Sequence, residues 1–247
     1  MKSVLITGCN RGIGLGLVKE ILKLPKPPKH LFATCRDPQK APELQQLATE
    51  HSSLHILQID LNNFTKYGGF VKSIDDIVKE EGLNLLINNA GIATKSTRIN
   101  MVKDTDMISS FVTNTVAPVM LSKAFLPLLK KASAFQPDAP LGVSRACIVN
   151  ISSILASNAK NVEGGVIAYR ASKAALNSAT KSMSIDLKDS KIITIALHPG
   201  WVKTSMGGSN APLDVDYSTK SIVQTLLTLN DTHNGGFYQY DGKELPW

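Results

Sequence analysis

Residues 2–14 read Lys2-Ser-Val-Leu-Ile-Thr-Gly-Cys-Asn-Arg-Gly-Ile-Gly14, and they say more about the fold than any other part of the chain. The first half is a short β-branched run that is typical of a buried strand. Three glycines follow, and an amphipathic helix pattern continues from Gly12 to about Leu24. A strand, a glycine turn and a helix form the first half of a dinucleotide-binding unit, in which free N–H groups of the helix face phosphates. An ordinary glycine-rich turn is the alternative, but the flanking strand and helix favour the dinucleotide turn.

Apolar runs and helical patterns alternate along the rest of the chain. The expected strands are Ser3–Thr7, Leu31–Cys35, Leu54–Ile59, Leu83–Asn88, Ala146–Ile151, Ile192–His198 and Gly236–Tyr240. The expected helices are about Gly12–Leu24, Ala41–Glu50, Phe64–Glu81, Asp104–Lys131, Tyr169–Lys188 and Tyr217–Leu229. This alternation predicts an α/β fold: a single Rossmann-type, doubly wound parallel sheet of about seven strands with helices on both faces. Residues 1–247 are expected to form a single domain, because no linker or repeat divides them.

The chain has 247 residues, 43% of them hydrophobic, and a formal net charge of +7. The positive residues are scattered and no aromatic residues are interleaved to stack bases, which argues against a nucleic-acid partner. No apolar run approaches the ~20 residues that span a bilayer, so no membrane segment is expected, and the strand-like start predicts no secretory signal. The three cysteines, Cys9, Cys35 and Cys147, lack metal-ligand spacing, so we expect no metal site and a cytoplasmic location.

A phenol and an ammonium lie four positions apart at Tyr169 and Lys173. On a helix this spacing places both side chains on one face, one turn apart. A tyrosine has an ordinary pKa of about 10, and a neighbouring cation lowers that pKa by favouring the phenolate. The pair therefore predicts a proton donor and acceptor, although the same spacing also occurs on many solvated helices.

Several motifs occur together in one order, which is more specific than any one of them alone. They are Thr7-Gly8-x3-Gly12-x-Gly14, Asn88-Asn89-Ala90-Gly91, Asn114, Ser153, Tyr169-x3-Lys173 and Pro199-Gly200. In this set the chain resembles the short-chain dehydrogenase/reductase family through essentially its whole length. The stretch Ile151–Ile154, the pair Gly164-Gly165 and the ending Tyr240–Trp247 make it most similar to the carbonyl reductases of the sniffer type. The resemblance implies an enzyme that reduces a ketone, an aldehyde or a quinone to the alcohol with NADPH.

The resemblance also implies a catalytic set. Tyr169 would be the general acid that protonates the carbonyl oxygen. Lys173 would lower the pKa of that phenol and bind the nicotinamide ribose. Ser153 would donate to the carbonyl oxygen and polarise it. Asn114 would hold a water in a proton relay to Lys173, unless, as a mid-helix asparagine, it simply bonds a backbone carbonyl.

The spacing of these residues departs from the family pattern. Ser153 and Tyr169 lie sixteen positions apart, which is longer than usual, and the extra residues fall in Ser157–Gly165. The insertion widens the loop beside the substrate and leaves Ser152 as an alternative to Ser153. Side chains alternate faces along a strand, so the two serines cannot both face the substrate. We choose Ser153, the second serine of the pair, and expect Ser152 to be structural.

Two arginines indicate which cofactor the chain prefers. NAD-binding proteins usually place an acid near the end of the second strand, whereas here Arg36 comes before the first acid, Asp37. Arg36 can meet a 2′-phosphate with paired N–H donors. Arg11, directly before Gly12, matches the basic position of NADP-preferring relatives. NADP(H) is therefore the expected cofactor.

The other expected cofactor contacts follow from the resemblance. Asp60 and Leu61 would hold the adenine, unless Asp60 caps the next helix. Val202 and Thr204 would fix the nicotinamide amide. The remaining expected contacts come from three places. The glycine turn contributes Gly8, Asn10, Arg11, Gly12, Ile13 and Gly14. The end of the fourth strand contributes Asn88, and the catalytic pair contributes Tyr169 and Lys173.

The glycine-rich stretch Ser205–Tyr217 shows little apolar periodicity. It is expected to be a mobile lid over a small-molecule carbonyl substrate, or else a plain surface loop. Two other functions stay open on the same fold: a non-catalytic NADPH-binding regulator, and an NAD-linked alcohol or steroid dehydrogenase. Relatives often pair through the helices Asp104–Lys131 and Tyr169–Lys188, so a homodimer is one expected state, although several carbonyl reductases are monomers.

Overall fold

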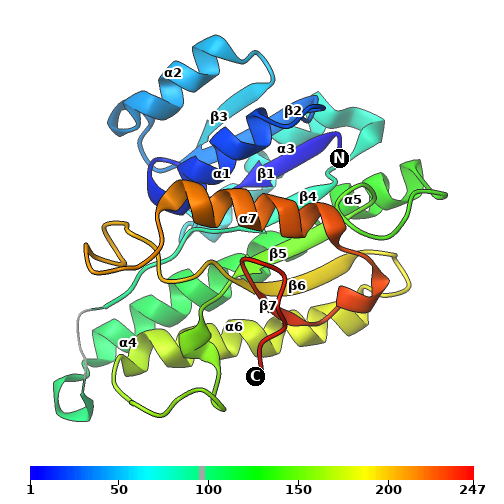
Figure 1. Cartoon of the computed structure of the whole chain (residues 1–247). Helices are drawn as coiled ribbons and strands as arrows, with labels where there is room; N and C mark the ends of the chain where they lie inside the picture. The colour runs from blue at the N-terminus through cyan, green and yellow to red at the C-terminus, as the bar shows by residue number, and fades with distance from the viewer. Residues whose placement is uncertain (95–97) are drawn as a thin grey trace.

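A parallel sheet of seven strands runs through the computed structural model, which describes residues 1–94 and 98–247 (Figure 1). The strands are β1 (Ser3–Ile6), β2 (His30–Cys35), β3 (Leu54–Gln58), β4 (Leu85–Asn88), β5 (Cys147–Ile151), β6 (Ile193–His198) and β7 (Phe237–Gln239). Their order is β3-β2-β1-β4-β5-β6-β7, and every pairing is parallel. The strand order changes direction between β1 and β4. Ligands of such sheets bind at this point, beyond the carboxyl ends of the strands.

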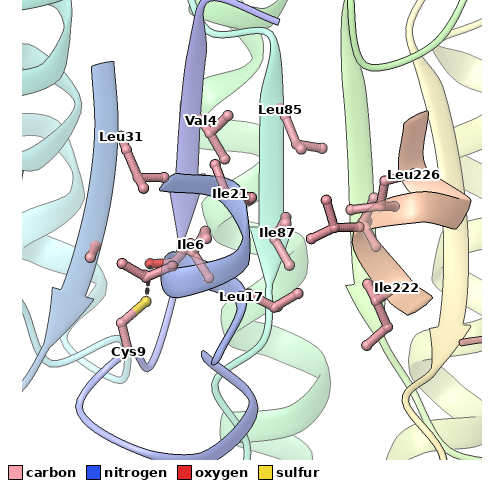
Figure 2. Packing of buried hydrophobic residues seen from close by; sticks show 14 of the residues in the cluster. Val4, Ile6, Cys9, Leu17, Ile21, Leu31, Leu85, Ile87, Ile222 and Leu226 are labelled. Carbon is pink, nitrogen blue, oxygen red and sulfur yellow. Dashed lines mark hydrogen bonds between the residues drawn. The ribbon is translucent and has the colours of Figure 1, made fainter. Parts of the chain in front are cut away.

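Helices cover both faces of the sheet (Figure 1). They are α1 (Gly12–Leu22), α2 (Pro42–Glu50), α3 (Tyr67–Val78), α4 (Asp104–Phe111), α5 (Ala117–Phe135), α6 (Ile167–Asp186) and α7 (Val215–Thr228). Figure 2 shows part of one core, where α1 and α7 meet the sheet through Leu17, Ile21, Ile222 and Leu226. A second core lies on the opposite face, beneath α3 and α5.

The strands carry nearly unbroken apolar runs because both faces of the sheet are covered. In β1, Val4 and Ile6 belong to the first core, while Leu5 between them belongs to the second. The predicted doubly wound sheet is therefore confirmed, and the strands lie within two residues of their expected bounds. The helix expected at Phe64–Glu81 is shorter, because 3₁₀ turns flank α3 at both ends.

The helix expected at Asp104–Lys131 is longer and changes its form in the middle. α4 ends at Phe111, a π-helical turn runs over Val112–Val116, and α5 continues to Phe135. Such π turns are rare in proteins, and those that occur are often found at functional sites. The side chain of Asn114, at the centre of this turn, is completely buried.

The combined helix Asp104–Phe135 is the one described element that bears on the expectation of no membrane segment. It has 32 residues, and an 18-residue window within it has a mean hydropathy of 1.3, so by length and composition it could cross a membrane. Its side chains Leu121, Phe125 and Leu129 are buried in the second core, against the sheet. Packing inside the fold thus accounts for the apolar composition of this helix.

Candidate active site

The glycine turn after β1 has the tight geometry that the sequence predicts. Gly8 and Gly12 have φ angles of 72° and 57°, a region that favours glycine. A Cβ on Gly14 would lie 2.2 Å from the carbonyl oxygen of Gly8 and 2.6 Å from Nδ2 of Asn89. No side chain fits there, so α1 starts directly against the end of β1. Arg11 precedes the helix and makes no side-chain capping bond, which leaves the first N–H groups of α1 available to an anion.

The neighbours of these glycines divide between surface and core. Asn10 is exposed, and Ile13 packs against the first core. Cys9 is buried, its thiol donates to the carbonyl of Ile6 (Figure 2), and burial raises the pKa of the thiol. Cys9 is therefore a packed residue rather than a reactive one.

The segment after β6 closes against the same turn. Cγ2 of Thr204 lies 3.3 Å from the point where a Cβ of Gly12 would stand. Val202 is buried and forms a β-bridge with Leu213. Of the two residues predicted to hold the nicotinamide, Thr204 therefore lies beside the glycine turn, and Val202 is fixed two residues before it.

Arg11 and Arg36 are both exposed, and neither forms an ion pair within the part of the chain that the structure describes. Asp37, the first acid after β2, pairs instead with Lys40 at 3.4 Å. Arg36 also lines a cavity of about 480 Å³ that reaches Asp60 at the end of β3. Two guanidinium groups free of carboxylates suit a phosphate.

Asp60 and Leu61 form a local turn after β3. The Asp60 carboxylate accepts a hydrogen bond from the backbone N–H of Asn62 at 3.0 Å, and the Leu61 carbonyl accepts one from the Tyr67 hydroxyl at 2.6 Å. The N-caps of the following 3₁₀ turn and of α3 are Asn63 and Lys66. Asp60 therefore caps neither helix, and the alternative role as a helix cap is wrong.

The side chain of Asn88 does not face the glycine turn, so a cofactor contact by this residue stays a prediction for its main chain only. It is buried and donates to Asn150 Oδ1 at 2.8 Å and to Ser122 Oγ at 3.1 Å, in the interior between β4, β5 and α5. The next residue makes the contact instead: Asn89 Nδ2 donates to the Thr7 carbonyl at 2.8 Å. The prediction from the sequence placed Asn89 in the same motif but did not choose it as a contact. Strand bounds alone do not say which of two adjacent amide side chains points toward the glycine turn.

Tyr169 and Lys173 lie in the first turns of α6, on one face as their spacing predicts. The Lys173 ammonium is buried, donates to the Ile151 carbonyl at 2.6 Å, and has its pKa lowered to about 8 by burial. Burial raises the pKa of Tyr169, and a hydrogen bond with Ser153 opposes that rise. The expected lowering of the Tyr169 pKa by Lys173 is therefore not found, because burial of the phenol raises the pKa and the opposing contribution comes from Ser153.

The two adjacent serines point to different places. Ser152 is buried and donates to Asn177 Oδ1 on α6 at 2.6 Å. Ser153 follows the end of β5, accepts from the Leu155 N–H at 3.2 Å and faces the Tyr169 phenol. This is the alternation of faces expected along a strand.

Asn114 joins the π turn to the segment after β4. Its Nδ2 donates to the Ile92 carbonyl at 2.8 Å and its Oδ1 accepts from the Ile92 N–H at 2.8 Å. The alternative weighed from the sequence, a bond to a backbone carbonyl, is therefore present, but the carbonyl belongs to a distant segment rather than to the same helix. A Cβ on Gly91 would lie 3.1 Å from Asn114 Oδ1 and 3.6 Å from Lys173 Nζ, so both polar groups flank one point.

The segment Ser205–Tyr217, which was expected to form a lid, is shorter in the structure than predicted. Val215–Tyr217 are already the first residues of α7. The segment is tied down at its base, where Lys203 pairs with Asp214 at 2.9 Å and the Trp201 indole donates to the Gly207 carbonyl at 2.7 Å. Trp201 and Met206 are exposed, and Ile92 is half-buried. Whether the segment moves stays a prediction.

Comparison with known proteins agrees with this geometry. The model of the short chain dehydrogenase family matches residues 2–213. The structure of the carbonyl reductase Sniffer of D. melanogaster is 57% identical, with a TM-score of 0.99 and coverage of 100% of both chains. The NADPH-bound carbonyl reductase from chicken fatty liver is 43% identical, with a TM-score of 0.96 over 100% of this chain and 94% of that one. The C-signal protein of Myxococcus xanthus is 37% identical over 67% of this chain and 93% of its own length.

A match over most of the length, with the glycine turn, the Ser153 and Tyr169 pair and the buried Lys173 in place, shows that this chain belongs to the short-chain dehydrogenase family.

Proposed function

We propose that this chain reduces a ketone, an aldehyde or a quinone to the alcohol with NADPH as the hydride donor. The observation that carries the proposal is the meeting of the Ser153 and Tyr169 hydroxyls beside the buried Lys173, at the carboxyl end of β5. Two solved proteins that the chain resembles over its whole length support it, since both are carbonyl reductases and one is bound to NADPH.

The residues around the glycine turn fit a dinucleotide phosphate. Gly8, Gly12 and Gly14 leave room for close approach, and the N-terminus of α1 has no side-chain cap. Arg11 and Arg36 would pair with a 2′-phosphate, which distinguishes NADPH from NADH. Asp60 and Leu61 would hold the adenine, and Val202 and Thr204 the nicotinamide end. When bound, the cofactor supplies the hydride, while the protein supplies orientation and the proton.

Tyr169 would supply that proton. Burial raises the pKa of its phenol, so the hydroxyl is protonated at neutral pH, as a general acid must be. Ser153 would donate to the same carbonyl oxygen and hold it within reach of Tyr169. The phenolic O–H bond breaks as the alcohol O–H bond forms, and Tyr169 is left as a phenolate.

Lys173 would stabilise that phenolate and help to reprotonate it. A buried amine with a pKa of about 8 exchanges its proton near neutral pH. Asn114 and Lys173 flank the same point next to Gly91, which supports a bridging water there as a proton path. Asn114 also holds the Ile92 main chain, so it would position this part of the site as well.

The test is steady-state turnover of a panel of ketones, aldehydes and quinones by the purified chain, with NADPH and with NADH. We expect reduction with a clear preference for NADPH. Tight binding of NADPH without turnover of any carbonyl would identify a non-catalytic regulator. Faster oxidation of alcohols or steroids with NAD would identify the dehydrogenase alternative.

A further inference from the structure

The C-terminal segment, residues 240–247, folds back against the end of the sheet next to β7 (Figure 1). Leu245 donates its N–H to the Phe237 carbonyl at 2.7 Å, and its side chain is buried against Phe237. The Trp247 ring stacks on the ring of Phe237, with centroids 5.5 Å apart and planes at 26°. Because Phe237 is completely buried in β7, this stack anchors Trp247 to the rigid sheet.

Trp247 in turn holds the loop that follows Ser153. Its main-chain oxygen accepts hydrogen bonds from Ser157 Oγ and from the Ala159 N–H, each at 3.1 Å. Ser157 is buried, and its Oγ also accepts from the Lys160 N–H at 3.2 Å. The first residues of the inserted loop, Ser157–Gly165, are therefore attached to the C-terminal segment.

Among residues 1–94 and 98–247, few other contacts hold this loop. Arg170 on α6 spans its base, donating to the carbonyls of Leu155 at 3.3 Å and Gly165 at 3.1 Å. Arg98 donates to the Glu163 carbonyl at 3.2 Å. Val162 near the tip is 89% exposed, so the loop has little apolar packing of its own. Its position therefore depends on a small number of attachments, of which Trp247 is the one at its start.

The loop also connects the two reacting groups along the chain. It is the connection between Ser153 and Tyr169, whose hydroxyls face each other. A carbonyl compound held between those hydroxyls would lie near the start of this loop, because Ser157 comes four residues after Ser153. We infer that Trp247 is a positioning residue, which acts through Ser157 and Ala159 to hold the 157–165 loop in place and thereby sets the affinity for the carbonyl substrate.

This inference rests on the proposed function, and its test compares variants of the full chain with the wild type. Trp247→Ala removes the stack on Phe237 and should raise the KM for a carbonyl substrate by about tenfold, the upper range for the loss of an aromatic pair. We expect kcat to stay within about twofold and NADPH affinity to be unchanged, because Trp247 touches neither Tyr169 nor the glycine turn. Hydrogen exchange of residues 157–165 should become faster in the variant.

Three further variants make the result specific. Trp247→Phe keeps the stack and should restore the wild-type KM. Ser157→Ala removes one attachment from the other side and should raise KM in the same direction. Lys243→Ala changes an exposed side chain of the same segment and should have no effect.

The outcomes separate this inference from the proposed function. A wild type that turns over no carbonyl compound would defeat the proposed function and with it this inference. An active wild type with an unchanged KM and unchanged loop exchange in both Trp247→Ala and Ser157→Ala would overturn the inference alone. A parallel loss of NADPH affinity in these variants would also overturn it, since it would show general damage to the fold.

Discussion

Replacing Ser152 and Ser153 by alanine, one at a time, should give two opposite results. Ser153→Ala removes a hydroxyl that faces Tyr169 and that also accepts a hydrogen bond from the Leu155 N–H at 3.2 Å. If Ser153 donates to the carbonyl oxygen, its loss should lower kcat by about 10²–10³-fold, the effect of removing one oxyanion donor. Stability should change little, because the hydroxyl is not a central part of a buried network.

Ser152→Ala should instead destabilise the fold. Ser152 is buried and donates to Asn177 Oδ1 at 2.6 Å. Asn177 is also buried, and its Nδ2 has no hydrogen-bond partner within the described residues. Loss of the serine would leave the amide without its bond, at a cost of about 1–3 kcal/mol in the free energy of unfolding. The melting temperature should fall by about 2–4 °C for each kcal/mol, while kcat stays within a few-fold.

The assay measures kcat with saturating NADPH and one carbonyl substrate, together with thermal unfolding, for both variants and the wild type. Each variant is the control for the other, because both change one hydroxyl to hydrogen at adjacent positions. If Ser152→Ala keeps the wild-type melting temperature and loses kcat as severely as predicted for Ser153→Ala, the assignment of the two serines is reversed and the geometric reasoning is wrong.

Three other predictions test the rest of the site. Tyr169→Phe should lower kcat by roughly 10²–10⁴-fold, the contribution of a general acid, with NADPH affinity within a few-fold of wild type; near-normal turnover would contradict its role. Arg36→Ala should weaken NADPH binding by roughly 10- to 150-fold in a fluorescence titration and leave NADH binding nearly unchanged, whereas equal losses would exclude 2′-phosphate recognition. Burial lowers the pKa of Lys173 from 10.5 to about 8. Between pH 8 and pH 10.5 the unfolded chain therefore binds more protons at this residue than the folded chain does. The contribution of Lys173 to the free energy of unfolding should then rise with pH over this range. Urea unfolding at pH 8 and pH 10 should show this rise in the wild type relative to Lys173→Met; the same pH dependence in both proteins would refute it.

The sequence was sufficient for the features that depend on local pattern. Apolar runs covered on both faces predicted the parallel strands, and the glycines of residues 8–14 predicted the turn into α1. The spacing of Tyr169 and Lys173 placed them on one face of α6, because the period of a helix is a local property. The alternation of faces, which continues in the extended chain just after β5, separated Ser152 from Ser153 in the same way. The single domain, the cytoplasmic location and the homodimer stay predictions.

Only the tertiary structure decided the features that depend on distant segments. It turned Asn88 inward and left Asn89 at the glycine turn, and it placed the Asn114 amide on the main chain of Ile92. It also set the direction of the Tyr169 pKa, since burial is a property of the whole fold. Ser157 and Trp247 are ninety residues apart in the chain, yet they are hydrogen-bonded. Hydrophobic periodicity says which face of an element is buried, but it does not say which other element lies against that face, and those contacts arise only when the sheet and its helices pack together.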